Sequence, residues 1–251
     1  MLIVLPPSEG KTRPASGPVL DLKSLSFPQL TKTRELLLRT LIKVSSGNPK
    51  RAADVLGLGP TQAASLDINT NLAEEPCARA DAVFTGVLFE AADLPTLDAD
   101  ARRPADATIA IASGLFGLVR PSDAIPAYRL AGNVTLPRLG TVASRWKPTM
   151  PRVLDEASGG GLIVDLRSGT YAAFGAAPAD RTASIRVLQE RDGKRSVVSH
   201  FNKATKGRIV RELLTSGADP ATPSELAATL KDLGWAVEQD GGKLDVIVTE
   251  V

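Results

Sequence analysis

The chain has 251 residues, of which 43% are apolar, and a formal net charge of +2. This apolar content can build a sizeable core and excludes a disordered protein, and the length suits one large domain. A single cysteine, Cys77, and a single histidine, His200, exclude a disulfide framework, cysteine-based metal sites and any site that needs two imidazoles. No apolar run reaches the ~18 residues of a membrane span, so we expect a cytoplasmic protein without a signal peptide.

The net charge is unevenly distributed along the chain. Residues 1–119 hold 12 basic and 13 acidic side chains, residues 120–211 hold 16 and 7, and residues 212–251 hold 2 and 8. The middle segment, called the basic block below, therefore carries a net charge of +9. Such a block indicates a surface that meets an anion, although solvated arginines are the simpler alternative.

The first half of the chain alternates short apolar runs with helical patterns. The apolar run Leu2–Leu5, which Pro6 and Pro7 end, predicts a buried strand. The spacing of leucines predicts a helix over 28–45, and two short helices follow at 49–56 and 60–66. The Pro- and Asp-rich stretch 93–106 is expected to be an exposed excursion.

The second half reads as strands, hairpins and two longer helices. We expect strands at 109–112 and 162–166, a hairpin over 183–199, helices at 203–215 and 223–233, and a final hairpin over 235–248. There is no internal repeat and no regular alternation of strand and helix. The prediction is a single α+β domain over residues 1–251, with a central mixed sheet flanked by helices.

The N-terminal segment Leu5–Thr12 ends in Gly-Lys-Thr, as a phosphate-binding P-loop does. A P-loop needs glycine where Leu5 stands and a helix directly after Thr12, whereas Pro6, Pro7 and the later prolines oppose both requirements. We reject a P-loop. Lys11 still follows a buried strand, where side chains often enter a cleft. No nucleophile motif is present, so no catalytic residue is assigned.

Two lysines share the inward face of the helix expected at 203–215. Lys203 and Lys206 project from the same arc as its apolar residues Ile209, Val210, Leu213 and Leu214. They either extend to water or line a polar cavity. With Asn202 as the expected N-cap, a helix N-terminus and two lysines would form an anion site.

Gly57 and Gly59 separate the two short helices expected within residues 49–66. This pattern fits a helix-hairpin-helix, whose glycines let backbone N–H groups approach a DNA phosphate. An ordinary helix–loop–helix corner fits the same pattern.

Three stretches together resemble the YaaA peroxide-stress family. They are Met1–Thr12, Ser113–Pro121 with Asp123 and Tyr128-Arg129-Leu130, and Phe201–Arg208. The resemblance spans nearly the whole chain. One departure is Ser-Glu-Gly-Lys before Thr12, where other members have Ser-Pro-Ala-Lys.

The resemblance implies a single α+β domain with a helix-hairpin-helix element and a positively charged cleft that binds DNA. It also implies a role in surviving peroxide, associated with limiting free iron and Fenton damage. The family's motif positions fall on the following residues: Lys11, Arg120, Arg129, Lys203, Arg208, Gly57 and Gly59.

Our functional prediction is a cytoplasmic oxidative-stress protein that binds the phosphate backbone of double-stranded DNA. The alternative is an enzyme acting on an anionic or nucleotide-like small molecule in the same cleft. A closed cavity of ~300–1,000 Å³ would favour the alternative and an open groove the duplex. We expect four cations to meet in the cleft, Lys11, Arg120, Arg129 and Lys203. Lys206 and Arg208 would assist, with Ser8 and Tyr128 lining it; no metal or cofactor is expected.

Overall fold

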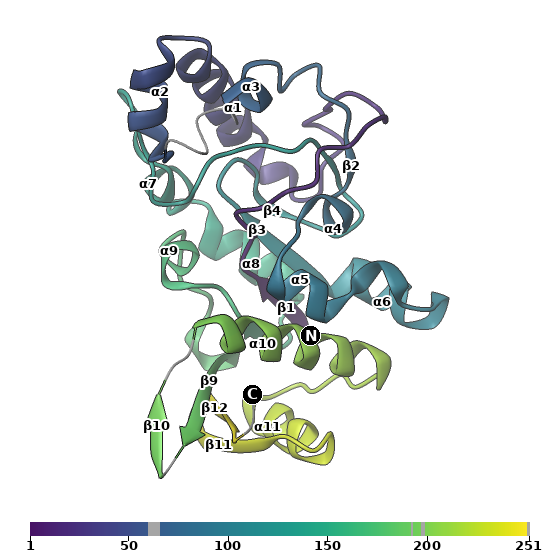
Figure 1. Ribbon diagram of the computed structural model, residues 1–251. Coiled ribbons are helices and arrows are strands. Elements are labelled where there is room, and N and C mark those ends of the chain that lie inside the picture. Colours follow the sequence, from purple (N-terminus) through teal and green to yellow (C-terminus); the bar gives the residue numbers. More distant parts are fainter. Residues whose placement is uncertain (60–65, 192, 197–198, 250–251) are drawn as a thin grey trace.

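The computed structural model describes residues 1–59, 66–191, 193–196 and 199–249, and residues 199–201 by their backbone only. The described chain forms a single α/β domain with eleven α-helices and one eight-stranded mixed sheet (Figure 1). The strand order is β11-β12-β9-β8-β1-β3-β4, and β10 pairs with β9.

The five central strands of this sheet run parallel, whereas β11, β10 and β4 pair antiparallel with their neighbours. The bounds of the sheet strands are β1 (Leu2–Leu5), β3 (Ile109–Ser113), β4 (Gly117–Val119), β8 (Ile163–Asp165), β9 (Thr182–Arg191), β10 (Lys194–Ser196), β11 (Ala236–Asp240) and β12 (Lys243–Val248). Two small pairs lie apart from this sheet: β2 (Ala78–Arg79) with β5 (Ala124–Ile125), and β6 (Thr135–Leu136) with β7 (Gly140–Thr141).

Strand β1 lies in the middle of the sheet and is buried along its whole length. Ile3 pairs with Ile109 of β3 on one side and with Val164 of β8 on the other. A parallel strand that is covered on both faces reads as a continuous apolar run, which is why Leu2–Leu5 is predictable from sequence. The parallel pairing also corrects the predicted fold class from α+β to α/β. The sequence did not indicate this pairing, because the partners of β1 are more than 100 residues away along the chain.

The helices surround the sheet. Their bounds are α1 (Thr31–Ser45), α2 (Pro49–Leu56), α3 (Leu66–Thr70), α4 (Ala80–Val83), α5 (Val87–Ala92), α6 (Ala99–Thr108), α7 (Val142–Trp146), α8 (Met150–Ser158), α9 (Gly169–Ala172), α10 (Ser199–Thr215) and α11 (Pro223–Asp232). Short 3-10 helices occupy Pro28–Leu30, Leu94–Thr96 and Ala179–Arg181. Among the helices of the described ranges, none combines the length and apolarity that crossing a membrane requires.

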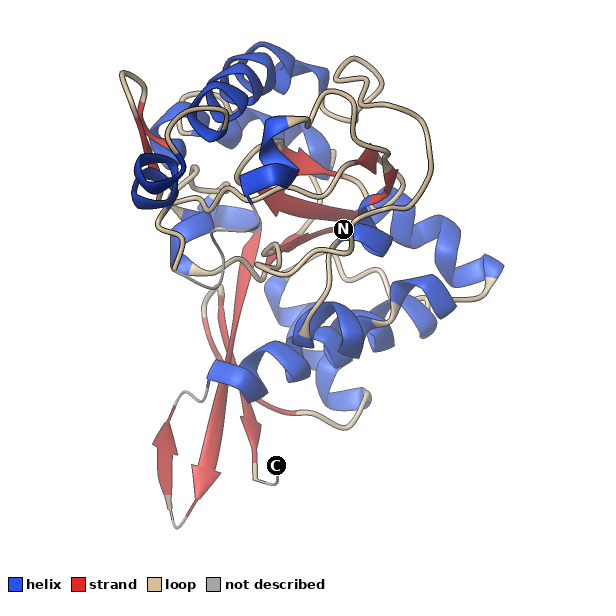
Figure 2. Ribbon diagram, turned by 45° about the horizontal axis from the view of Figure 1, so that its top comes forward, coloured by secondary structure: helices blue, strands red, loops and turns tan. Residues whose placement is uncertain are grey.

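Helices α5 and α10, which line the site described below, pack against each other. Helix α10 packs along α5 and also contacts α6 and β9, and α11 covers β11 and β12. Helix α1 packs against α2, α3 and α7 at the opposite end of the molecule (Figure 1). The hairpin of β9 and β10 projects from the body in both views (Figures 1 and 2).

The stretch predicted as an exposed excursion contains a helix instead. Helix α6 includes Pro104, and the side chain of Asp98 caps its N-terminus by accepting a hydrogen bond from the Ala101 amide. Proline removes one backbone hydrogen bond from a helix interior. The burial of Ala101 and Ala105 offsets that loss.

The described residues include only the first helix and the glycines of the predicted helix-hairpin-helix. Helix α2 ends at Gly57, whose φ of 64° is the left-handed conformation that glycine favours at a helix C-terminus. The predicted second helix at 60–66 lies almost wholly outside the described residues. The hairpin therefore stays a prediction.

Candidate functional site

A cavity of about 440 Å³ lies where the parallel strands β1 and β8 end. Its walls are the loop 6–10 after β1, the residues 85–89 that lead into α5, the segment after β8, and α10. Carboxyl ends of adjacent parallel strands meet at one edge of a sheet, which is where open α/β folds place their ligand sites. Its polar lining residues are Ser8, Glu9, Thr85, Ser168, Tyr171, Asn202, Lys203 and Lys206.

Ser8 fixes the loop that forms one wall of this cavity. Its hydroxyl donates to the Gly10 carbonyl (2.5 Å) and accepts a hydrogen bond from the Thr85 amide (3.0 Å). The loop is thereby attached to the start of α5. Ser8 is one of the residues that line the cavity.

Lys11 directly follows that loop and is partly buried beside it. Its Nζ donates to the Ser8 carbonyl (2.8 Å) and lies 4.4 Å from the ring centroid of Tyr128 and 5.2 Å from that of Phe84. Burial lowers the pKa of Lys11 to about 7; Glu9 acts to raise it and Arg129 to lower it further. At neutral pH a large fraction of this amine is therefore uncharged.

Tyr128 lies beneath Lys11 rather than on the cavity wall, which corrects its predicted role as a lining residue. Its hydroxyl is 2.6 Å from the Ser113 hydroxyl, and its ring packs edge-on against Phe116. Burial raises its pKa above the ordinary value of tyrosine, so the phenol stays protonated. Tyr128 thus supplies an aromatic face to the Lys11 amine.

The two lysines of α10 both line the cavity, as their shared helical face predicts. Lys203 is exposed, whereas Lys206 is half-buried and its Nζ lies 3.5 Å from the Leu166 carbonyl. Burial lowers the pKa of Lys206, and Asp165 opposes that shift. Neither lysine forms an ion pair within the described residues.

Asn202 has a different role from the one its sequence position indicates. Helix α10 begins at Ser199, so Asn202 lies inside the helix and is not its N-cap. Its Oδ1 atom is buried and has no hydrogen-bond partner among the described residues, although Asn202 lines the cavity. A buried acceptor without a partner costs about 1–3 kcal/mol. Sequence reasoning missed this acceptor and Tyr171, because neither stands in a recognisable motif.

Arg129 stands beside the cavity loop. Its Nη1 donates to the Glu9 carbonyl (2.6 Å), and its backbone is held by the side chain of Asn69. Its charge also acts on Lys11. Lys11 and Arg129 therefore contact the loop that forms one wall, but unlike Lys203 and Lys206 they do not line the cavity.

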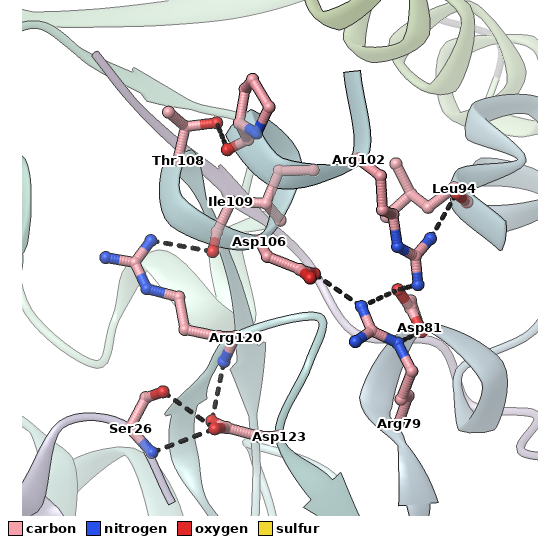
Figure 3. Close-up of polar contacts among 11 residues, drawn as sticks. Ser26, Arg79, Asp81, Leu94, Arg102, Asp106, Thr108, Ile109, Arg120 and Asp123 are labelled. Atoms are coloured by element: carbon pink, nitrogen blue, oxygen red, sulfur yellow. Dashed lines mark hydrogen bonds and ion pairs between the residues drawn. The ribbon is translucent and has the colours of Figure 1, made fainter. Parts of the chain in front are cut away.

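Arg120 lies elsewhere, so the prediction that four cations meet in one cleft is wrong for this residue. Its Nη1 donates to the carbonyl of Ile109, and its backbone amide donates to Asp123 (Figure 3). Ile109 begins β3, whereas Ser113 at the other end of that strand contacts Tyr128. Four strand residues separate the two ends by about 13 Å. Arg208 is exposed on α10 and does not line the cavity.

Carboxylates of the same chain neutralise part of the basic block. Ion pairs with carboxylates involve the following arginines: Arg152, Arg167, Arg181, Arg186, Arg195 and Arg211. Outside the block, Arg79 and Arg102 hold the buried carboxylate of Asp81, and Arg79 also contacts Asp106 (Figure 3). Charge counting along a sequence cannot separate such paired arginines from cations that are available to a ligand.

A second cavity of about 530 Å³ lies between α1, α2 and the β6–β7 pair. Lys43, Arg51 and Arg138 line it, and none of the three forms an ion pair with a described residue. Arg51 lies in the first turn of α2, whose N-cap is the side chain of Asn48. Unneutralised cations therefore gather at a second place, next to the helix that precedes Gly57.

We expect Cys77 of the folded protein to resist hydrogen peroxide. The thiol is buried, and burial raises its pKa to about 11, so only on the order of 10⁻⁴ of it is thiolate at pH 7. Mass spectrometry after peroxide treatment should find Cys77 unmodified in the native protein and oxidised after denaturation. A sulfenic acid trapped at Cys77 of the native protein would contradict this expectation.

The fold and site define an α/β protein with a lysine-lined cavity at the carboxyl edge of a mixed sheet. A family model described as "Peroxide stress protein YaaA" matches residues 1–240. The chain is 46% identical over 261 residues to a UPF0246 protein of Streptomyces coelicolor and 40% identical over 256 residues to one of Corynebacterium efficiens, each alignment covering 100% of both chains. A UPF0246 protein of Cereibacter sphaeroides is 30% identical over 254 residues, covering 96% of this chain and 95% of the relative. The chain therefore belongs to the YaaA peroxide-stress family.

Proposed function

We propose that this protein of the peroxide-stress family protects the cell by binding DNA through its phosphate backbone. The observation that supports the proposal best is a pair of cavities lined by cations that have no carboxylate partner among the described residues. These cations are Lys203 and Lys206 at the α10 cavity, and Lys43, Arg51 and Arg138 at the second cavity. Like charges that are held together favour an anion, and phosphate groups repeat along a duplex at a spacing that several cations can share.

The link to iron is proposed to be indirect. No group of three or more histidine, cysteine or acidic side chains within the described ranges could hold a metal ion. To hold an iron ion, a protein needs several histidine, cysteine or acidic side chains that converge on it. We therefore attribute peroxide protection to covering DNA against Fenton chemistry, and not to iron held by this chain.

We expect binding to double-stranded DNA to weaken steeply with salt. For 4–6 phosphate contacts, log affinity should fall against log salt with a slope of roughly −4 to −5. The double variant Lys203→Ala, Lys206→Ala should reduce the slope by about two and weaken all DNA sequences equally, because phosphate contacts carry no base information. Fluorescence anisotropy titrations at several salt concentrations measure both quantities.

The matched control is Lys231→Ala, which removes an exposed lysine from α11 outside the basic block. It should leave the slope unchanged. Gly59→Val tests the hairpin, because an added Cβ at Gly59 meets no atom of the described residues within 4 Å. Weaker binding by this variant would support backbone contacts to DNA at the hairpin. Undetectable DNA binding at low salt would overturn the proposal.

A second candidate function is the binding and conversion of an anionic small molecule in the 440 Å³ cavity. Its volume falls in the range of small-ligand pockets, and Lys203 and Lys206 line it. Thermal shift with a panel of sugar phosphates and nucleotides tests this candidate. Stabilisation that Lys203→Ala abolishes would favour it, whereas no stabilisation by any member would exclude these ligand classes.

A further inference from the structure

The second cavity, between α1, α2 and the β6–β7 pair, is lined by charges of one sign. These charges belong to Lys43 of α1, Arg51 of α2 and Arg138 of the turn between β6 and β7. None of the described residues that line it is acidic, whereas Glu9 lines the first cavity together with its two lysines. Three separate elements thus bring three cations to one cavity.

Arg138 has a backbone conformation that arginine seldom adopts. Its φ is 64°, and it follows Pro137 in a turn that the Leu139 amide closes by donating to the Leu136 carbonyl (3.1 Å). Glycine or asparagine is the usual residue with positive φ in such a turn, because a Cβ there crowds the backbone. The Arg138 side chain is exposed and has no ion pair among the described residues, so packing within the chain does not account for it. Strained residues of this kind are concentrated at binding sites.

Most of the remaining cavity wall is apolar. It consists of Val44 on α1, Ala52 and Val55 on α2, and Pro137 with Leu139 in the turn. The volume of about 530 Å³ is that of a small-ligand pocket. A ligand that uses the whole wall therefore combines an anionic group with an apolar or aromatic body.

We propose that this cavity binds the terminal phosphate monoester of a nucleotide, with the cations around the phosphate and the apolar wall against the nucleoside. A phosphate monoester carries a charge of about −1.5 to −2 at pH 7, whereas each phosphate of a duplex carries about −1. Three cations without carboxylate partners match the larger charge. A monoester also has a single organic substituent, so it can end inside a cavity that a continuous backbone would have to enter and leave. The inference goes beyond the proposed function, which assigns these cations to phosphates along a duplex.

The local chemistry of the cations also favours phosphate. Arg51 and Arg138 each offer a planar guanidinium, which can donate two parallel hydrogen bonds to phosphate oxygens. The N-terminus of α2 lies at the cavity, because its N-cap Asn48 and Arg51 of its first turn are both lining residues. The partial positive charge of a helix N-terminus favours a nearby anion. Lys43 adds a third full charge from the neighbouring helix α1.

Isothermal titration calorimetry with deoxyadenosine monophosphate tests the inference. We expect saturable binding that is at least about tenfold weaker for deoxyadenosine, which lacks the phosphate, and for inorganic phosphate, which lacks the nucleoside. A light-activated azido derivative of the same nucleotide should label peptides of α1, α2 or the β6–β7 turn. The inference is wrong if the nucleotide does not bind, if inorganic phosphate binds as tightly, or if the label is confined to other peptides.

The variant Arg138→Gly separates binding from folding. Glycine relieves the left-handed conformation, so the thermal unfolding midpoint should stay the same or rise, whereas nucleotide affinity should fall at least about tenfold. Lys43→Ala changes only an exposed side chain and should weaken binding in the same direction.

The matched control is Arg39→Ala. Arg39 is an exposed cation one turn before Lys43 on α1, and it does not line the cavity. This control should change the affinity by less than about twofold, because an exposed charge outside the site acts only through screened attraction. If Arg138→Gly kept the wild-type affinity, or if Arg39→Ala lowered it as much, the cavity would not be the binding site.

The monoester could belong to a free nucleotide or to the 5′ end of a DNA strand. One duplex, prepared with 5′-phosphate or with 5′-hydroxyl ends, is tested as a competitor of deoxyadenosine monophosphate. Competition by the phosphorylated duplex alone would identify a strand end, and competition by neither would identify the free nucleotide. Equal competition by both would mean that the cavity accepts internal phosphodiesters, which contradicts the inference. Duplex binding without nucleotide binding would overturn this inference alone, and nucleotide binding without duplex binding would overturn only the DNA proposal.

Discussion

Replacing Gly207 by alanine is expected to lower the free energy of unfolding by about 2 kcal/mol. A Cβ added at Gly207 would lie 2.3 Å from the Leu88 carbonyl oxygen and 2.7 Å from the Ala91 Cβ, so α10 and α5 would have to separate. Overpacking of this kind costs about 1–3 kcal/mol. In an exposed helix the same substitution stabilises by about 1 kcal/mol, so the sign of the change is diagnostic.

The substitution should also disturb the cavity, because α5 and α10 form two of its walls. Urea unfolding gives the stability change, and DNA and sugar phosphate titrations give the effect on binding. Gly169→Ala is the matched control, since an added Cβ there meets no atom within 4 Å in the part of the chain that the structure describes. Because Gly169 is an exposed helical residue, we expect that control to stabilise the protein by about 0.4–1 kcal/mol, opposite in sign to Gly207→Ala. A Gly207→Ala protein as stable as the wild type would show that the two helices are not in close contact.

Replacing Arg34 by methionine is expected to cost about 4 kcal/mol of stability. The Arg34 side chain is fully buried. Its guanidinium donates to the carbonyls of Phe116 (2.9 Å), Leu118 (2.7 Å) and Ser26 (2.7 Å). Methionine fills a similar volume but leaves two buried acceptors and one partly buried acceptor unpaired, and each buried one costs about 1–3 kcal/mol.

One effect opposes this loss. Arg34 forms no ion pair among the described residues, and burial lowers its pKa to about 10, so removing its charge relieves a desolvation cost. The exposed Arg39 on the same helix is the matched control, and Arg39→Met should change stability by less than about 0.5 kcal/mol. Urea unfolding measures both. If Arg34→Met equalled the wild type, the desolvation of Arg34 would outweigh its three hydrogen bonds.

The position of Arg34 explains why the motif around Arg120 does not reach the cavity. Arg34 binds the carbonyls of Phe116 and Leu118, on either side of the first residue of β4, and Asp123 accepts from Ser26 and from the Arg120 amide. The turn after β4 is thus held by buried polar contacts. The motif around Arg120 therefore stabilises the turn after β4, whereas other elements provide the residues that line the cavity.

Local pattern was sufficient for much of the secondary structure. The apolar run of β1, the helices α1 and α11 and the hairpins β9–β10 and β11–β12 follow from periodicity, turn residues and caps close in sequence. The shared face of Lys203 and Lys206 also followed, because a helix places residues three apart on one side. These features depend on neighbours within a few residues, which is the information that a single sequence contains.

Only the tertiary structure decided which strands pair and which cations remain free. The parallel neighbours of β1 lie more than 100 residues away, so no local signal distinguished α/β from α+β. Helix α6 forms despite Pro104, because burial and capping outweigh the missing hydrogen bond. The neutral amine of Lys11, the unused acceptor of Asn202 and the ion pairs of the basic block all result from burial and long-range contact. The physical reason is that desolvation and charge pairing depend on distance in space, which sequence separation does not report.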